Sequence, residues 1–159
     1  MKTLVIGLGN PILGDDGVGW KVAEEVKKKI PADLRVDVEC LSLGGISLME
    51  HLIGYRRAIL VDAFALDEPI GSILMLKLDD MPNYSAYHTT SAHDTSLQNA
   101  IAMGKSLGAK LPDEVMVVGI ATKRIHEFSE ELSPSVSNAV PLAAKFVLEL
   151  IEEKVKAEK

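Results

Sequence analysis

The sequence has little cysteine, no excess of basic charge and no long apolar run. Cys40 is the single cysteine among 159 residues, which excludes an intramolecular disulfide and a thiolate metal cluster. Lys and Arg number 17 against 23 Asp and Glu, a formal net charge of −6. Because phosphate binding needs a basic face, nucleic acid is not an expected partner. No apolar run approaches the ~20 residues of a membrane-spanning helix, and no targeting segment is recognisable, so we expect no membrane insertion and a cytoplasmic location.

What is present is ordinary for a globular protein, with 47% apolar and 25% charged residues. A chain of this length buries roughly 70% of its unfolded surface in one core. Neither internal repeats nor a low-complexity linker divides it, so a single domain over residues 1–159 is expected. Cys40 lies within an apolar run and is expected to be a buried core thiol. Its position in the middle of a strand makes it a poor nucleophile.

Short runs of Val, Ile and Leu alternate with amphipathic segments along the chain. Two of the runs are almost continuously apolar, which is typical of strands buried on both faces of a parallel sheet. Strands are predicted at Thr3–Gly7, Arg35–Leu41, Ala58–Ala63, Ser72–Leu78 and Val115–Ala121. Helices are predicted at Val18–Ile30, Ile46–Ile53, Thr95–Leu107 and Pro134–Lys154.

This order predicts an α/β fold with three layers, α/β/α, around a mostly parallel, twisted five-stranded sheet. The link between the third and fourth predicted strands, from Ala63 to Ser72, is shorter than the dozen or more residues that a parallel crossover needs. The fourth strand is therefore expected to run antiparallel to the third, at an edge of the sheet. The first and third strands are expected to be neighbours, as is usual in doubly wound sheets.

The loop after the first strand reads Gly7-Leu-Gly-Asn-Pro-Ile-Leu-Gly14 and is followed by Asp15 and Asp16. A dinucleotide fingerprint needs a third glycine where Ile12 stands, so this interpretation is disfavoured. A simple turn, with glycines chosen for positive φ, is an alternative. The third interpretation is a site loop in which an acid binds a cation or water. Asp15 is then expected to cap the helix that follows, which leaves Asp16 to face the crevice at the carboxyl ends of the strands.

Two further residues could share that crevice. Asp62 ends the apolar run Ala58-Ile-Leu-Val-Asp62, where a carboxylate is costly unless it is paired, hydrated or metal-bound. His93 follows the longest irregular stretch, Asp79–Thr90, and directly precedes a predicted helix. A strand-end acid and a lone loop histidine can each be purely structural. Together with Asp16, however, they offer two carboxylates and one imidazole, which suit a borderline divalent ion and leave positions open for substrate or water.

With these motifs in view, the chain resembles the hydrogenase maturation peptidases, which trim the C-terminus of [NiFe]-hydrogenase large subunits. The resemblance covers nearly the whole chain, and the order of acid, acid and histidine is its most specific part. Its motifs are Val5-Ile-Gly-Leu-Gly-Asn-Pro-Ile-Leu-Gly-Asp-Asp-Gly-Val-Gly19, Leu60-Val-Asp-Ala63, Ser91-Ala-His-Asp94, Val118-Gly-Ile120 and Leu132-Ser-Pro-Ser-Val136.

The resemblance implies that Asp16, Asp62 and His93 are both the metal-binding and the catalytic residues. It implies that these side chains recognise nickel that is already inserted in the precursor of the large subunit. The cofactor then arrives with the substrate. Gly44 and Gly45 match a family segment and are the implied substrate-binding residues. Many members carry an acid before these glycines, where this chain has Ser42-Leu43. A role of that acid in choosing or cutting the substrate therefore cannot be carried over to this chain.

Two other functions remain open at this stage. One is a nickel-sensing maturation chaperone that binds the precursor without cutting it. The other is peptidyl-tRNA hydrolase, whose opening resembles Gly7-Leu-Gly-Asn-Pro11 but continues with a Thr-Arg-His-Asn-type stretch, where this chain has Gly14-Asp-Asp-Gly-Val18. The acidic net charge also disfavours a tRNA ligand.

Overall fold

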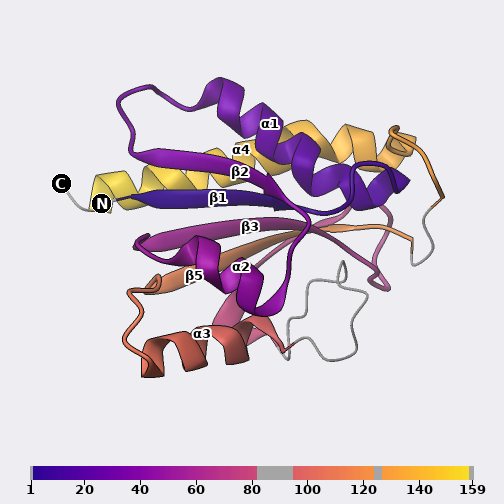
Figure 1. Ribbon diagram of the computed structural model, residues 1–159. Helices are drawn as coiled ribbons and strands as arrows, with labels where there is room; N and C mark the ends of the chain where they lie inside the picture. The colour runs from indigo at the N-terminus through magenta and orange to yellow at the C-terminus, as the bar shows by residue number, and fades with distance from the viewer. Residues whose placement is uncertain (1, 82–94, 124–126, 158–159) are drawn as a thin grey trace.

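Five strands form a single sheet in the order β2-β1-β3-β5-β4 in the computed structural model, which describes residues 2–81, 95–123 and 127–157 (Figure 1). Neighbouring strands are parallel except for the last pair, in which β4 is antiparallel to β5. The bounds are β1 (Thr3–Leu8), β2 (Val36–Leu41), β3 (Arg57–Phe64), β4 (Ile73–Lys77) and β5 (Glu114–Ala121).

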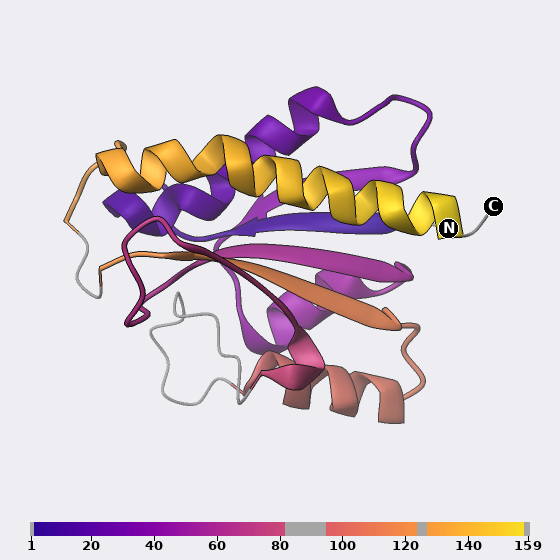
Figure 2. The same ribbon diagram turned by 180° about the vertical axis from the view of Figure 1, so that it is seen from behind.

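Helices cover both faces of this sheet, as the two opposite views show (Figures 1 and 2). One face is covered by α1 (Val18–Lys29) and α4 (Pro134–Ala157), which pack against each other. The other face is covered by α2 (Gly45–Leu52) and α3 (Leu97–Ser106). Two short 3₁₀ helices, η1 (Gly14–Gly17) and η2 (Leu78–Asp80), follow β1 and β4. In the part of the chain that is described, no helix combines the length and the apolar character needed to span a bilayer.

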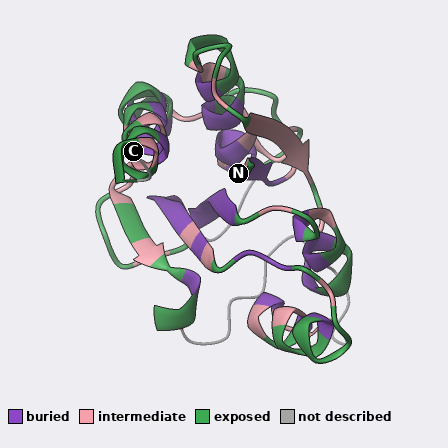
Figure 3. Ribbon diagram, turned by 90° about the vertical axis from the view of Figure 1, so that its left-hand side faces the viewer, coloured by how far each residue is buried: buried purple, intermediate pink, exposed green. Residues whose placement is uncertain are grey.

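The two faces of β3 belong to two separate hydrophobic clusters. Ile59 and Val61 pack with the side chains of α1 and α4, whereas Ala58 and Leu60 pack with those of α2 and α3. This follows from the period of two in a strand, which sends successive side chains to opposite faces. Figure 3 shows the result, with buried residues on the inward sides of the elements. Each fully buried aliphatic side chain stabilises the fold by about 1.5–3 kcal/mol.

The predicted α/β fold with a mostly parallel five-stranded sheet is confirmed, including the neighbouring first and third strands and the antiparallel edge strand. The hydrogen-bonded partner of β4 is β5 rather than β3. The expectation for Cys40 is wrong in degree, because its side chain is only partly buried. The reason is that β2 forms the other edge of the sheet, where none of its residues is fully buried.

The start of α1 lies directly on the backbone of β1 and β3. A Cβ atom on Gly19 would lie 2.3 Å from the carbonyl oxygen of Leu8 and 2.4 Å from that of Val61. Only a residue without a side chain allows this approach. It holds the loop between β1 and α1 against the carboxyl ends of the two central strands.

We expect Gly19→Ala to lower the free energy of unfolding by more than about 3 kcal/mol, since the added methyl group would meet two backbone oxygens that cannot move aside. Gly104→Ala in α3 is the matched control. There the Cβ would meet the flexible side chains of Leu111 and Met49, and the better helix propensity of alanine offsets part of the cost. Urea unfolding monitored by circular dichroism measures both, and equal losses would contradict this account of Gly19.

Candidate functional site

Buried polar side chains gather at the carboxyl ends of the parallel strands. Among the described residues, four polar or charged side chains are buried, namely Asp16, Arg57, Asp62 and Thr122. Asp16 follows β1, Asp62 lies near the end of β3, and Thr122 follows β5. Arg57 alone lies at the opposite end, where β3 begins. Open α/β sheets bind their ligands at the carboxyl end, so this end is the candidate site.

Asp62 is the most deeply buried of these side chains, with an exposed fraction of 0%. The last paired residues of β1 and β3 are Gly7 and Val61, so Asp62 is the first residue of β3 beyond that pairing. Its Oδ1 accepts a hydrogen bond from the backbone N–H of Ala63 at 2.8 Å. The carboxylate is thereby held at the point where β1 leaves the sheet. A carboxylate buried in this way is costly for folding unless other groups or a cation compensate for its charge.

Asp16 is held by a tightly folded loop. It lies in η1 with 6% of its surface exposed, and its Oδ2 accepts the backbone N–H of Asn10 at 2.9 Å. Gly9 makes the fold of the loop possible: its φ is +141°, and a Cβ there would lie 2.0 Å from the carbonyl oxygen of Asp16. The glycines thus bring backbone and acid together at the sheet, as the site-loop interpretation requires.

The structure brings Asp16 and Asp62 to the same end of the same two strands. The 3₁₀ helix that carries Asp16 contacts β3. Gly19, a few residues further on, lies against the carbonyl of Val61, the neighbour of Asp62. His93 lies outside the described residues, so its position relative to the two acids stays a prediction. Within residues 2–81, 95–123 and 127–157, no group of three or more His, Cys, Asp or Glu side chains could hold a metal ion. A metal site built on these two acids therefore needs a ligand from elsewhere.

Asp15 does not cap the helix that follows it, and this expectation is wrong. The residue that caps α1 is Gly17, which makes no side-chain bond. The carboxylate of Asp15 instead accepts two hydrogen bonds from Ser133, one from its backbone N–H at 2.6 Å and one from its hydroxyl at 2.7 Å. Ser133 directly precedes α4, so Asp15 joins the loop after β1 to the beginning of the last helix.

Gly44 and Gly45 lie at the same end of the sheet, because they follow β2, which runs parallel to β1. Both are buried, and Gly45, the first residue of α2, has a φ of +53°. Of the two residues in place of the acid found in relatives, Ser42 donates a hydrogen bond to the carbonyl of Gly9, and Leu43 packs against the core. Neither can supply a carboxylate.

Thr122 is a candidate site residue that the motif search missed. It is 2% exposed and is the first residue after β5, and its backbone N–H donates to the carbonyl of Phe64 at 2.8 Å. The signal that singles out Asp62, a polar residue at the end of a buried apolar run, applies equally to Thr122. A threonine was overlooked because its hydroxyl carries no charge.

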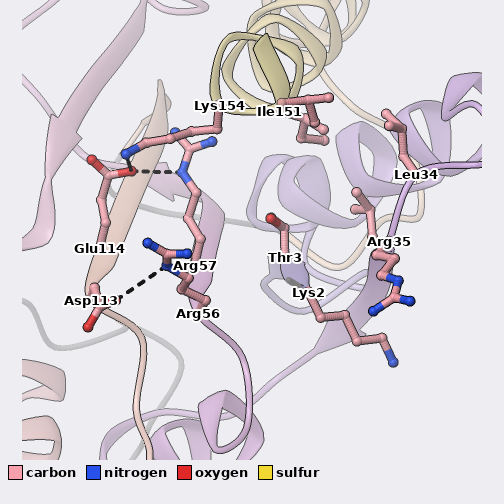
Figure 4. A pocket seen from close by; sticks show the side chains of 12 residues that line it. Lys2, Thr3, Leu34, Arg35, Arg56, Arg57, Asp113, Glu114, Ile151 and Lys154 are labelled. Carbon is pink, nitrogen blue, oxygen red and sulfur yellow. Dashed lines mark hydrogen bonds and ion pairs between the residues drawn. The ribbon is translucent and has the colours of Figure 1, made fainter. Parts of the chain in front are cut away.

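A cavity of about 130 Å³ lies at the opposite end of the sheet (Figure 4). Its charged groups are largely paired with each other: Glu114 binds Arg57 at 2.8 Å and Lys154 at 3.7 Å, and Asp113 binds Arg56 at 3.5 Å. Arg57 also donates to the carbonyl of Leu150 in α4. We interpret these contacts as structural, because they join β3, β5 and α4 at the amino end of the strands.

Two other reactive side chains do not join the site. Burial raises the pKa of the Cys40 thiol, which disfavours the nucleophilic thiolate. His51 is paired elsewhere, because its Nδ1 lies 3.0 Å from Oε2 of Glu39. The pair joins α2 to the edge strand β2.

We expect Asp15→Ala to lower the free energy of unfolding by about 1–2 kcal/mol, because it removes two hydrogen bonds to one carboxylate. Ser133→Ala removes one of them. A double-mutant cycle in urea should show a coupling of about 1 kcal/mol between the two positions. Strictly additive losses would show that the Asp15–Ser133 contact contributes nothing.

Curated relatives resemble this chain along almost its whole length. A putative hydrogenase maturation protease of Methanocaldococcus jannaschii is 29% identical over 156 residues, which cover 96% of each chain. The protein FrxA of Pyrococcus furiosus is 30% identical over 142 residues, which cover 89% of this chain and 98% of that protein.

Solved structures show the same fold. The hydrogenase maturating endopeptidase HybD of Escherichia coli superposes with a TM-score of 0.79 at 22% identity, covering 97% of this chain and 94% of that one. The [NiFe] hydrogenase maturation protease HycI of Thermococcus kodakarensis superposes with a TM-score of 0.69 at 17% identity, covering 95% and 92%. The family model described as "Hydrogenase maturation protease" matches residues 21–150. The chain therefore belongs to the hydrogenase maturation protease family and is a peptide hydrolase.

Proposed function

We propose that this protein is the endopeptidase that removes the C-terminal tail of a [NiFe]-hydrogenase large-subunit precursor, and that it acts on precursor that already carries nickel. Asp16 and Asp62, joined by His93, are the proposed ligands of that ion. The nickel belongs to the substrate in this proposal. Precursor without nickel then lacks the group that completes the site, which makes cleavage conditional on metal insertion.

The observation that carries the proposal is the burial of Asp16 and Asp62 at one end of the sheet. Their exposed fractions are 6% and 0%. Two buried carboxylates near the same strands repel each other and lose hydration, so such an arrangement favours a cation between them. The expected donor set is two carboxylate oxygens and one imidazole nitrogen. This set suits nickel, and it leaves coordination positions for the substrate.

The roles of the side chains follow from how each is held. The N–H of Asn10 orients the Asp16 carboxylate, and the N–H of Ala63 orients that of Asp62. One of the two acids is proposed to take the proton from the water that attacks the scissile bond, as a general base. The nickel borne by the precursor would supply Lewis-acid polarisation of the scissile carbonyl.

Gly44 and Gly45 are the proposed contacts with the extended substrate chain. They lie beside the loop that carries Asp16, since Ser42 donates to Gly9 in that loop. A glycine backbone lets a peptide approach closely without a side chain in the way.

Mass spectrometry of a nickel-loaded precursor tests the proposal directly. We expect Asp16→Asn, Asp62→Asn and His93→Ala each to lower the cleavage rate by about 10²–10⁴-fold, the usual contribution of a positioned acid or base. Asp33→Asn is the control and should cleave normally, because Asp33 is exposed and lies in the turn between α1 and β2, at the amino end of the strands. Near-normal rates in all three site variants would refute the assignment. Binding of the precursor without a change in its mass would instead indicate the chaperone.

The same variants separate catalysis from folding. Asp62→Asn removes a buried charge but keeps an oxygen that can accept the N–H of Ala63. We therefore expect its thermal midpoint to stay equal to that of the wild type or to rise, while cleavage is lost. A structural role for Asp62 predicts the reverse, a lower midpoint with cleavage retained.

A further inference from the structure

The segment 127–133, which precedes α4, is fastened to the loop that carries Asp16. Leu13 and Ser129 form an isolated parallel bridge. Within it, the N–H of Gly14 donates to the carbonyl of Ser129 at 2.8 Å, and the N–H of Ser129 donates to the carbonyl of Ile12 at 2.9 Å. The two hydrogen bonds between Ser133 and Asp15 close the same connection further along. The two loops therefore form one connected unit next to the site.

The bridge brings two exposed apolar residues together. Ile12 and Phe128 each stand one residue before the bridged pair. The hydrogen bond from the N–H of Ser129 to the carbonyl of Ile12 holds the backbones of these two segments together at this point. Ile12 is 48% exposed and Phe128 is 86% exposed. We refer to these two side chains as the Ile12–Phe128 patch. Single exposed apolar residues are common on protein surfaces, but two adjacent ones held by backbone bonds at the edge of a site call for an explanation.

Polar residues flank Ile12 and Phe128 along the two segments. Glu127, Glu130 and Glu131 are exposed on the same segment, and Lys123 and Asp15 line a shallow cavity together with Glu127 and Glu131. Apolar centres with polar rims are typical of protein-binding surfaces, where the rim keeps water away from a few central contacts. Aromatic residues at such centres contribute more than most others to the binding energy.

We propose that the Ile12–Phe128 patch is a docking surface for the protein substrate, and that it receives an apolar side chain of the precursor close to the bond that is cut. This inference rests on the proposed function, because it takes the precursor as the occupant. The position of the patch favours the precursor as the occupant, because Ile12 lies in the loop that carries Asp16. Any chain that covers the patch therefore lies beside the candidate site.

The backbone hydrogen bonds between the two segments favour binding at the patch, because they reduce the entropy lost on association. Ordering a mobile loop on association costs about 0.5–1.5 kcal/mol for each immobilised side chain. Here the backbone of both loops is already fixed by hydrogen bonds before the substrate arrives. The patch thus offers a preformed apolar contact, and its contribution is uniform binding that serves the ground state and the transition state alike.

Binding and cleavage of nickel-loaded precursor by Phe128→Ala and Ile12→Ala test the inference. We expect Phe128→Ala to raise both the Kd and the KM about 10-fold, in line with the loss of a central aromatic contact, and to leave kcat within about twofold. Ile12→Ala should act in the same direction with a smaller effect, and Phe128→Leu should restore most of the affinity. Leu107→Ala is the matched control: Leu107 is 80% exposed but follows α3, at the opposite end of the sheet.

The outcomes are separable from those of the proposed function. Unchanged Kd and KM in both alanine variants overturn the docking surface, as does a loss of kcat without a change in Kd. If the wild type binds the precursor through Phe128 but never cleaves it, the peptidase proposal fails and the docking surface stands. Self-association that Phe128→Ala abolishes, with unchanged affinity for the precursor, would assign the patch to a second copy of the chain instead.

Discussion

The contact on which the candidate site depends is the packing of the first turn of α1 against the backbone of β1 and β3. At Gly19 the helix meets the carbonyl oxygens of Leu8 and Val61 without a side chain between them. This contact sets the path of the chain from β1 into α1, and Asp16 lies on that path. The loop must then fold back on itself within a few residues, and Gly9 permits this at the carbonyl of Asp16. The absence of a side chain at Gly19 and at Gly9 thus allows the backbone path that positions the Asp16 carboxylate.

The burial of Asp16 and Asp62 opposes the stability of the fold, because two carboxylates lose hydration. In the described part of the chain, the other buried charge, Arg57, has an ion pair with Glu114 and a carbonyl acceptor in α4. The acids at the carboxyl end are instead held by backbone N–H groups of their own loops. A side chain of the fold thus neutralises Arg57, and backbone hydrogen bonds orient the two carboxylates.

Much of the fold could be predicted because the local patterns and the tertiary structure agree. The apolar runs of β3 and β5 are buried on both faces, and the short link before β4 enforces an antiparallel strand. The location of Asp16 and Asp62 at the same end of the sheet was predictable for a similar reason, since the carboxyl ends of neighbouring parallel strands meet at one edge. The partner of Asp15 could not be predicted, because Ser133 lies 118 residues away in the chain. Helix capping is a local rule, and here a distant hydroxyl and N–H compete successfully with it. The partial exposure of Cys40 was missed because edge position follows from strand order, which a single apolar run does not reveal.

The link between Asp15 and Ser133 also has a consequence for biosynthesis. The loop that carries Asp16 is supported at Ser129 and Ser133, which follow it by more than 100 residues. During translation the early strands and helices leave the ribosome well before these supports exist, and domains are completed as units. The loop that carries Asp16 consequently gains these supports only after Ser129 and Ser133 have left the ribosome.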